Sequence, residues 1–381
     1  HARLNDPFIQ ILDPAVGTGT FIVEVIDIIY HSMKSKWEKT VENKEDIKYL
    51  WNDYVNDHLI PRIYGFELMM APYSICHVKL GLKLKETGFN LKNAKDRFNI
   101  YLTNTLEKPQ DLLAALFKPF LAIESDEANR IKLNVPITII IGNPPYSGIS
   151  KNKGKWISEL VNDYKYVDGE HFKEKKHWLN DDYVKFIRYS EQLIEKSKTG
   201  IIGFINNHSF LDNPTFRGMR WHLFQTFEKI NIIDLHGNTK KKEVCPDGSP
   251  DKNVFDIQQG VSINIFLKVS QKNNKTKAAL FHKDLWGGRN KKYEYLQNNN
   301  LNDIDLKVTQ TQKPFMFFVP KDYSLLNSFY KTVSICDIFN LRSVGVVTAR
   351  DKFCIDNDYN ALNNRIKDFT NKDKTNNYIK V

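Results

Sequence analysis

Short apolar runs alternate with longer apolar or amphipathic segments through the first two thirds of the chain. Runs such as FIQILD and ITIIIG have the length and composition of buried strands. The pattern predicts strands at residues 8–13, 62–68, 99–106, 137–142, 200–206, 230–236 and 261–269. It predicts helices at residues 21–33, 71–88, 181–197 and 215–227. Repeated strand–helix units predict an α/β fold, with a mostly parallel sheet and helices on both faces.

Two polar segments interrupt this alternation. Residues 147–182 are rich in lysine and aromatic side chains and long for a structureless loop, which favours either a functional or a disordered segment. Residues 237–253 form a turn-rich stretch that carries Lys240, Lys241 and Lys242. The alternation ends near residue 270, so we expect a new α/β or mixed module to begin near residue 315.

Charge and cysteine usage narrow the class of protein. The 381 residues include 55 lysines and arginines against 45 acidic residues, and the formal net charge of +10 favours a polyanionic partner. Cys76, Cys245, Cys336 and Cys354 form no CxxC pair, which argues against a zinc site or a disulfide framework, and free thiols indicate the cytoplasm. No apolar run approaches the roughly 20 residues that span a bilayer. The chain begins at His1 almost directly on a strand, so we expect a fragment.

A glycine turn joins the first predicted strand to its helix in the stretch DPAVGTGTF, residues 13–21. Glycines let the backbone approach a ligand closely, and the helix start adds oriented N–H groups. No lysine follows the second glycine as in a phosphate-binding P-loop, and no third glycine completes the GxGxxG spacing of a dinucleotide site. We therefore expect a nucleoside-type ligand without a pyrophosphate, with Asp13 facing a cationic amine directly or through water.

An acidic residue ends the second predicted strand, in the stretch YGFEL. The carboxylate of Glu67 can accept hydrogen bonds from both hydroxyls of a ribose at this place. Taken alone, the glycine turn has the simpler interpretation of an ordinary connection, and Glu67 that of a solvated carboxylate. Together they point to S-adenosylmethionine as the ligand.

The stretch IIIGNPPYSG, residues 139–148, places an amide side chain, two prolines and a tyrosine after an apolar strand. Two adjacent prolines fix two φ angles and remove two N–H donors, so the turn is rigid and its carbonyl groups point outward. A plain turn gains nothing from an asparagine at 143 or an exposed tyrosine at 146. We therefore expect this turn to offer hydrogen-bond acceptors to a ligand.

The order of DPAVGTGTF, the GFE strand end and NPPY resembles the N6-adenine DNA methyltransferases of the gamma order, in which target recognition comes last. VFDIQQGVSINIFLK and SVGVVTARDKF further resemble large single-polypeptide restriction-modification enzymes, in which such a methyltransferase is fused to nuclease or helicase parts. The resemblance covers residues 8–270 well and the tail more loosely. It implies a Rossmann-like, class I S-adenosylmethionine-dependent methyltransferase, followed by the start of a target-recognition module.

The resemblance also implies a set of cofactor contacts: Asp13, Ala15, Gly17, Gly19, Glu67 on the ribose, Leu68 beside the adenine, and Asn104. Asn104 stands where the family usually has an aspartate that accepts the adenine amine of the cofactor, and an amide oxygen accepts the same bond without charge. Relatives carry a threonine-proline motif upstream of the glycine turn, and HARLNDPFIQ contains none. We therefore expect an incomplete cofactor pocket and weak cofactor binding.

By the same resemblance, a flipped adenine places its N6 between the Asn143 side-chain oxygen and the Pro144 carbonyl, while Tyr146 stacks on the base. Accepting both amine protons keeps electron density on the nitrogen and stabilises charge as the methyl group arrives. We expect Phe216 to supply the second stacking face. Phe210 is the alternative, and a core position on an amphipathic helix is the competing interpretation of Phe216.

Six lysines of the polar segment are candidates for DNA-backbone contacts: Lys151, Lys153, Lys155, Lys173, Lys175 and Lys176. Trp156 and Trp178 lie nearby in sequence, as in a surface that follows phosphates. Interspersed acidic residues make a solvated loop the competing interpretation. Five histidines show no HExxH or other ligand spacing, and no metal is assigned to them: His171, His177, His208, His222 and His236.

The sequence thus predicts methyl transfer from S-adenosylmethionine to N6 of adenine in double-stranded DNA, as part of a restriction-modification system and without a membrane partner. Two alternatives stay open: a methyltransferase that acts on protein glutamine or RNA, and a DNA-recognition module that no longer methylates. The expected organisation is a methyltransferase domain at residues 1–270, a connector at 271–314, and part of a target-recognition module at 315–381.

Overall fold

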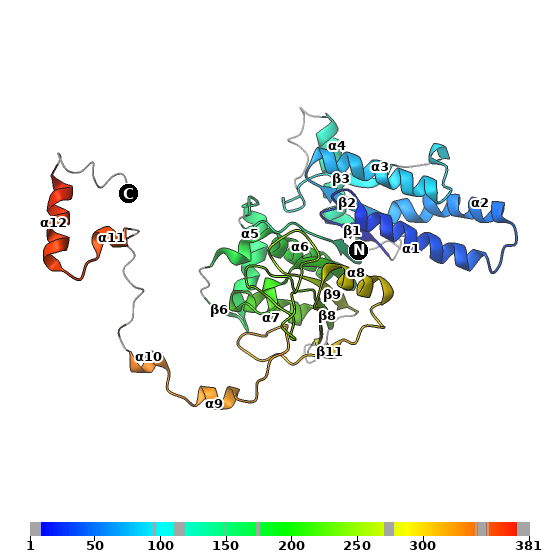
Figure 1. Cartoon of the computed structure of the whole chain (residues 1–381). Helices are drawn as coiled ribbons and strands as arrows, with labels where there is room; N and C mark the ends of the chain where they lie inside the picture. Colours follow the sequence, from blue (N-terminus) through cyan, green and yellow to red (C-terminus); the bar gives the residue numbers. More distant parts are fainter. Residues whose placement is uncertain are drawn as a thin grey trace. The chain divides into compact units, whose positions relative to one another are not determined.

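The computed structural model describes residues 9–93, 97–109, 119–148, 150–172, 176–269, 278–339, 341, 348 and 350–371. The chain divides into two units, His1–Lys321 and Asp322–Val381 (Figure 1). The strands of the first unit are β1 (Ile11–Asp13), β2 (Ile63–Glu67), β3 (Asn99–Leu102), β4 (Ile139–Gly142), β5 (Tyr166–Val167), β6 (Glu170–His171), β7 (Gly200–Asn207), β8 (Lys229–Asp234), β9 (Val261–Lys268), β10 (Ala279–Asp284) and β11 (Lys307–Val308). Its α-helices are α1 (Thr20–Trp37), α2 (Lys44–Tyr54), α3 (Met70–Glu86), α4 (Pro119–Asn134), α5 (Lys155–Asn162), α6 (Asp182–Ser197), α7 (Arg217–Thr226) and α8 (Arg289–Asn298).

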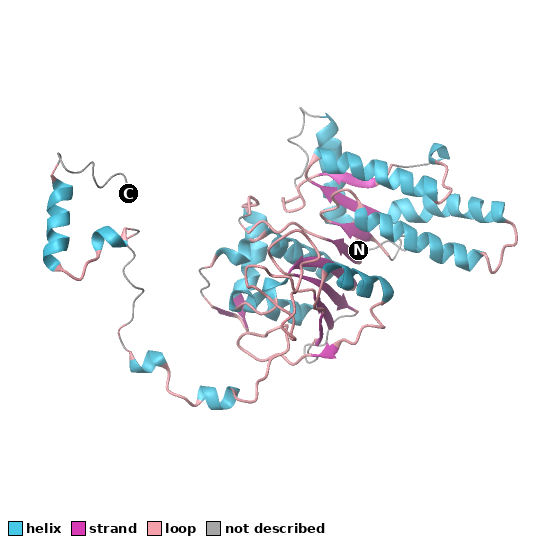
Figure 2. Cartoon of the chain, in the orientation of Figure 1, coloured by secondary structure: helices cyan, strands magenta, loops and turns pink. Residues whose placement is uncertain are grey.

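The central sheet of the first unit has the strand order β11-β10-β8-β9-β7-β4-β1-β2-β3. The pairs from β7 through β4, β1 and β2 to β3 are all parallel. Strand β9 lies between β7 and β8 and is antiparallel to both, whereas β10 is parallel to β8. Figure 2 shows the strands of this unit in magenta, with its helices packed around them in cyan. This arrangement confirms the mostly parallel α/β sheet that the sequence predicts.

Both faces of the sheet are covered, because successive strand residues belong to different core clusters. Ile11 and Ile139 pack in one cluster with residues of α1 and α3, and Leu12 and Ile140 pack in the other with residues of α6. Alternate side chains of a strand point to opposite faces, so apolar residues at both positions require a layer of helices on each side. This explains why the strands read as continuous apolar runs in the sequence.

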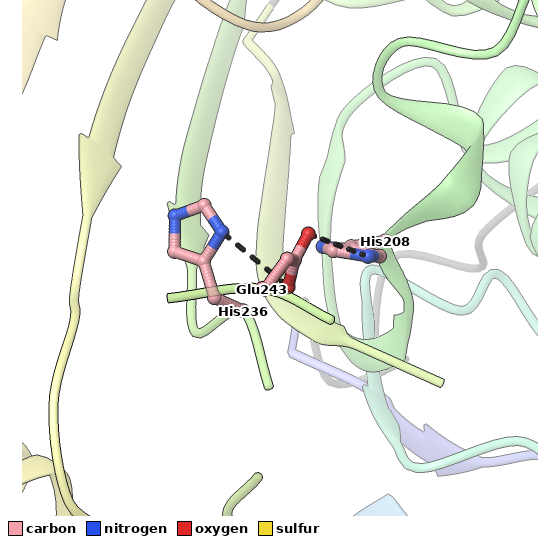
Figure 3. Close-up of side chains that lie close together, drawn as sticks. All are labelled: His208, His236 and Glu243. Atoms are coloured by element: carbon pink, nitrogen blue, oxygen red, sulfur yellow. Dashed lines mark ion pairs between the residues drawn. The ribbon is translucent and has the colours of Figure 1, made fainter. Parts of the chain in front are cut away.

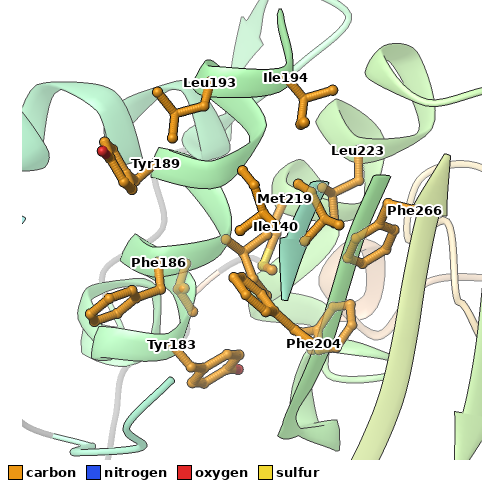
Figure 4. Packing of buried hydrophobic residues seen from close by; sticks show 14 of the residues in the cluster. Ile140, Tyr183, Phe186, Tyr189, Leu193, Ile194, Phe204, Met219, Leu223 and Phe266 are labelled. Atoms are coloured by element: carbon orange, nitrogen blue, oxygen red, sulfur yellow. The ribbon is translucent and has the colours of Figure 1, made fainter. Parts of the chain in front are cut away.

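Aromatic side chains fill the face that α6 and α7 cover. Tyr183 of α6 is 1% exposed, and Phe204 of β7, Met219 of α7 and Phe266 of β9 are fully buried (Figure 4). Close-packed interiors of this kind fix the relative positions of the elements they join. The core therefore holds α6 rigidly against β7, next to the end of β4.

The first unit continues beyond the strand at which the sequence alternation ends. The sequence predicts a connector at residues 271–314, but the described part of this range supplies β10, α8 and β11 to the first unit. The boundary between the two units falls after Lys321. The fully buried guanidinium of Arg220 donates hydrogen bonds to the carbonyl oxygens of Phe315, Met316 and Phe210, with the shortest at 2.6 Å. Five donors on one planar group can satisfy several carbonyl groups at once. Residues 315–316 are therefore anchored to the sheet unit.

The segment of residues 147–182 is neither structureless nor one long loop. It contains helix α5, a 3-10 turn at Asp163–Lys165 and the short antiparallel pair of β5 and β6. Tyr164 is fully buried and donates a hydrogen bond of 2.9 Å to the buried Glu191 of α6. The sequence pattern did not predict α5, because its apolar residues follow a lysine-rich stretch that obscures the helical period.

The second unit consists, in its described residues, of short helices. They are α9 (Leu326–Tyr330), α10 (Ile335–Ile338), α11 (Asp351–Cys354) and α12 (Tyr359–Thr370). Phe353 and Phe369 pack with ring centroids 5.1 Å apart and join α11 to α12. Most of the SVGVVTARDKF stretch lies outside the described residues. Among the described helices of the whole chain, none is both long and apolar enough to cross a membrane.

Candidate functional site

The glycine turn lies where β1 ends and α1 begins, at the carboxyl edge of the parallel strands. Gly17 and Gly19 have φ angles of +55° and +82°, which side chains other than glycine rarely adopt. A Cβ atom on Gly19 would lie 2.7 Å from the Cys76 sulfur of α3. The turn can therefore pass close to α3 and keep its backbone N–H groups near the strand ends only with glycine at this position.

Glu67 connects the ends of β1 and β2. Its Oε2 atom accepts a hydrogen bond of 2.9 Å from the Gly17 N–H, and its Oε1 atom accepts one of 2.8 Å from the Met69 N–H. A carboxylate has about four acceptor positions, so two bonds leave capacity for hydroxyl groups of a ligand. Leu68 and Met69 are 63% and 62% exposed and present apolar surface beside this carboxylate. The sequence identified Glu67 and Leu68 as candidates but not the hydrogen bond between Glu67 and Gly17.

Asp13 is the buried acid of the site. Its side chain is 1% exposed, and its Oδ1 atom accepts a hydrogen bond of 3.0 Å from the Ala15 N–H. A Cβ atom on Gly142, just before NPPY, would lie 2.7 Å from the same oxygen, so only glycine allows β4 to end this close to Asp13. Burial, the largest cause, and the nearby Glu67 charge raise the pKa of Asp13 from 3.8 to about 7, although the hydrogen bond from the Ala15 N–H acts in the opposite direction.

This raised pKa predicts a pH dependence of stability. Between about pH 4 and pH 7 the unfolded chain ionises Asp13 while the folded chain keeps it protonated, so the free energy of unfolding should fall as pH rises through this window. Asp13→Asn removes the titration and retains an amide oxygen for Ala15. We expect the variant to be more stable than the parent at pH 8, by up to about 4 kcal/mol.

Urea unfolding at pH 5, 6, 7 and 8 measures this effect. Asp53→Asn on α2 is the matched control, because Asp53 is exposed. Parallel pH profiles for the parent and Asp13→Asn would contradict a titrating buried acid at this position.

Asn104 lies directly after β3, but its amide group is already engaged. Its Nδ2 atom donates to Glu107 Oε1 at 3.1 Å and to Asn152 Oδ1 at 3.0 Å, and its Oδ1 atom accepts from the Leu106 N–H at 3.1 Å. One lone pair of this oxygen remains for an adenine amine. The contact to Asn152, 48 residues away, ties this turn to the segment that follows NPPY.

The NPPY turn follows β4, next to β1 on one side and β7 on the other. Asn143 is exposed, Pro144 is buried and Tyr146 is half-buried. The Tyr146 hydroxyl donates a hydrogen bond to the Asn143 side-chain oxygen, and burial raises the pKa of Tyr146. In this conformation the phenol thus occupies the acceptor that the sequence analysis assigned to a substrate amine.

An acid that sequence reasoning missed holds the end of this turn. Asp181, at the N-terminus of α6, accepts hydrogen bonds from the Ser147 and Gly148 N–H groups at 3.0 and 3.1 Å. Its neighbour Asp182 accepts 3.0 Å from Asn152 Nδ2. In the sequence, the signal for this contact was the pair of consecutive acids, Asp181 and Asp182, at the start of a predicted helix. Because α6 is fixed in the core, these bonds fix the position of the turn as well.

Phe216 does not face the solvent in this structure. It is 2% exposed and its ring centroid lies 6.3 Å from that of Tyr183, which in turn lies 6.4 Å from Tyr146. Phe210 is also fully buried beside Tyr183. The aromatic neighbour of Tyr146 is therefore Tyr183, and Phe216 occupies the core position that was its competing interpretation.

The candidate DNA-backbone lysines lie along α5 and the loops around it. Lys151, Lys153, Lys155 and Lys176 are exposed, and Lys155 lies 3.8 Å from Glu159. Lys173 and Lys175 lie outside the described residues.

The histidines show no ligand spacing along the sequence, but the structure brings His208, His236 and Glu243 together from separate elements.

Comparisons with known proteins agree with this architecture. The family model of the Eco57I restriction-modification methylase matches residues 62–240, which include β2 with Glu67 and the NPPY turn. No curated protein matches the chain.

Three solved structures share the fold. They are a nuclease-deletion mutant of the Type ISP restriction-modification enzyme LlaGI in complex with a DNA substrate mimic (TM-score 0.69, 22% identity), the ATP-dependent Type ISP enzyme LlaBIII bound to DNA (0.68, 23%) and the DrdV–DNA complex (0.66, 24%). Each alignment covers 96% of this chain but only 29%, 24% and 35% of the respective relative. The chain therefore spans about a quarter to a third of their length, and the class I methyltransferase fold is confirmed.

Proposed function

We propose, from the premise that residues 62–240 form an Eco57I restriction-modification methylase domain, that the chain transfers a methyl group from S-adenosylmethionine to N6 of adenine in double-stranded DNA. The observation that carries this proposal is the meeting of three strand ends. The glycine turn after β1, Glu67 at the end of β2 and NPPY after β4 lie on adjacent parallel strands. Ligands of open α/β sheets bind at this carboxyl edge.

The residues at the strand ends fit S-adenosylmethionine, which supplies an activated methyl group when bound. Gly17 and Gly19 give the turn its positive φ angles and let it pass close to α3, and Glu67 offers oxygens for ribose hydroxyls. A buried Asp13 with a raised pKa is a suitable partner for a cationic group, because a nearby positive charge stabilises the carboxylate. Leu68 and Asn104 then contact the adenine, in line with their exposure and their place after β2 and β3.

The NPPY turn supplies the acceptors for the reacting amine. Asn143 Oδ1 and the Pro144 carbonyl accept the two N6 protons, and the ring of Tyr146 stacks on the base. Binding of the amine replaces the bond that the Tyr146 hydroxyl now donates to Asn143. Asp181 holds the turn through Ser147 and so limits its movement while this exchange takes place. No covalent nucleophile is required.

Methyl-transfer assays with labelled S-adenosylmethionine test the proposal directly. We expect label in adenine of double-stranded DNA and none in RNA or in protein glutamine. Calorimetry with S-adenosylmethionine alone decides whether the chain is instead a DNA-recognition module that no longer methylates. Label in RNA or protein but not DNA, or the absence of both cofactor binding and transfer, rejects the proposed activity.

We also propose that the second unit begins a target-recognition module and that nuclease or helicase parts belong to the longer parent polypeptide. The support is the partial coverage of the restriction-modification enzymes that share the fold. Sequence-selective DNA binding would then depend on residues after 321, whereas electrostatic binding would depend on the first unit.

Electrostatic DNA binding should show as a salt dependence. Each phosphate that a lysine neutralises contributes about 0.9 to the slope of log affinity against log salt. Replacing Lys151, Lys153 and Lys155 by alanine should lower this slope, by about 0.9 for each lysine that contacts a phosphate. Fluorescence anisotropy at several salt concentrations measures it, with the exposed Lys36 of α1 replaced as control. An unchanged slope in the triple variant would exclude these lysines from the DNA surface.

A further inference from the structure

Two histidines and a glutamate converge at the carboxyl ends of β7 and β8, at the same edge of the sheet as the glycine turn, with β4 between β7 and β1 in the strand order. His208 follows β7, His236 follows β8, and Glu243 lies in the turn-rich loop between β8 and β9 (Figure 3). The glutamate carboxylate lies between the two rings, 3.9 Å from His208 Nε2 and 4.0 Å from His236 Nδ1. These distances are too long for hydrogen bonds, so the three groups face one another without satisfying one another.

The surroundings of His208 orient its ring. Its Nδ1 atom lies 3.0 Å from Asp234 Oδ1, an acceptor, and its Nε2 atom lies 3.2 Å from Asn238 Nδ2. The Asn238 oxygen is used by the Lys241 N–H at 3.1 Å, which assigns Nδ2 as the group that faces the ring. An acceptor at Nδ1 and a donor at Nε2 together indicate the neutral tautomer with its proton on Nδ1. The lone pair of Nε2 therefore accepts a hydrogen bond from the Asn238 amide in this conformation, and a metal ion bound to Nε2 would take the place of this bond.

In His236 the two ring nitrogens have exchanged roles, because Nε2 faces a carboxylate and Nδ1 faces the cluster. Its Nε2 atom lies 2.8 Å from Asp284 Oδ1, and the ring stacks on Trp286 with a centroid separation of 3.3 Å. The residue is 7% exposed, and its Nδ1 atom has no hydrogen-bond partner among the described residues. A buried ring nitrogen without a hydrogen-bond partner is costly, and this one faces two carboxylates beyond hydrogen-bond distance, Asp234 at 3.7 Å and Glu243 at 4.0 Å.

We propose that His208 Nε2, His236 Nδ1 and a Glu243 carboxylate oxygen form a binding site for one divalent transition-metal ion of the zinc type. Each metal-binding histidine in proteins usually donates its other ring N–H to a carboxylate, which is what Asp234 and Asp284 provide. Imidazole nitrogen and carboxylate oxygen are ligands that zinc accepts. The site is separate from the methyl-transfer chemistry and does not depend on it.

The dimensions of the cluster are compatible with such an ion. The three ligand atoms lie within 4.8 Å of one another, and ligands of a tetrahedral zinc ion at bonds of about 2.0 to 2.1 Å lie about 3.3 Å apart. The ligand atoms must therefore approach one another by about 1.5 Å or less. Glu243 can supply this movement because it lies on a loop and not on a strand. The cluster opens onto a cavity of about 250 Å³, also lined by Asp212 and Lys321, which leaves room for a water at the fourth position.

Another histidine-acid cluster of the described residues is less suited to a metal ion. Glu191, Glu195 and His222 also lie close together, but the Arg188 guanidinium is 3.5 Å from Glu191 and 3.2 Å from Glu195. A fixed cation between the acids already balances their charge and would repel a metal ion. Bound metal at the proposed site would instead fasten the loop of residues 237–253 to the ends of β7 and β8.

Metal binding to the 381-residue chain tests this site without DNA or cofactor. Equilibrium dialysis against Zn²⁺ followed by elemental analysis should find one equivalent, and Co²⁺ should give the intense visible absorption of a four- or five-coordinate ion. His236→Gln and Glu243→Gln should abolish tight binding. Asp284→Asn should weaken it by about 10-fold to 100-fold, because Asp284 orients His236.

His177→Gln is the matched control, since His177 is exposed and outside the cluster. It should bind zinc like the parent. Absence of bound zinc in the parent chain, a Co²⁺ spectrum like that of the aqueous ion, or unchanged binding in Glu243→Gln would each overturn the proposal. The first two results need no variant, so they decide even where a substitution prevents folding. Methyl transfer by a zinc-free chain would leave the proposed function intact.

Discussion

Asn143→Ala should reduce single-turnover methylation of adenine DNA by about 100-fold to 1000-fold, the usual cost of losing one preorganised acceptor or donor at a reacting group. The substitution keeps both prolines, the bonds from Asp181 to the turn and the ring of Tyr146. It removes the side-chain amide, whose oxygen now accepts from the Tyr146 hydroxyl and is the atom that we assign to the N6 amine. DNA affinity should change little.

Three further variants make this result interpretable. Asn134→Ala, at the exposed end of α4, is the same substitution away from the site and should be silent. Tyr146→Phe keeps the stacking ring and releases the Asn143 oxygen, so its rate should stay within about tenfold of the parent, whereas Tyr146→Ala should weaken capture of the base. Parental rates for Asn143→Ala would mean that NPPY is a structural turn and that the proposed mechanism is wrong.

Glu67→Ala should weaken binding of S-adenosylmethionine by roughly tenfold to a hundredfold, because hydrogen bonds to a charged group are worth about 1.5 to 3 kcal/mol. The carboxylate acts twice in the structure. It holds the glycine turn through the Gly17 N–H and places a second oxygen beside the Met69 N–H, where ribose hydroxyls would bind. Isothermal titration calorimetry of the chain with the cofactor or its demethylated product measures the change.

Glu67→Gln separates the two effects. The amide oxygen still accepts one backbone N–H, so the glycine turn can stay in place while the charge is lost, and affinity should fall between those of the parent and Glu67→Ala. Glu24→Ala on α1 is the exposed control and should leave affinity unchanged. Equal affinities for the parent and Glu67→Ala would remove Glu67 from the cofactor site.

The sequence determined the sheet and its ligand-facing edge because both depend on local patterns. Apolar runs of strand length, such as those ending at Asp13 and Gly142, predicted β1 and β4, and the glycine turn and NPPY could be placed at the carboxyl ends of those strands. Glu67 could be assigned to the same ligand site, because the ends of neighbouring parallel strands share one edge of the sheet. None of these steps needed a contact between residues far apart in the sequence.

Tertiary structure alone decided which side chains meet. The strand order places β9 between β7 and β8, and this brings His208 and His236 to Glu243 although their spacing in the sequence carries no signal. Core packing turned Phe216 inward, since the helical period predicts an apolar face but not what covers it. Bonds such as Asp181 to the Ser147 N–H join elements 34 residues apart. A pattern along the chain records which face of an element is apolar, whereas the partners of its polar atoms exist only after the elements have packed.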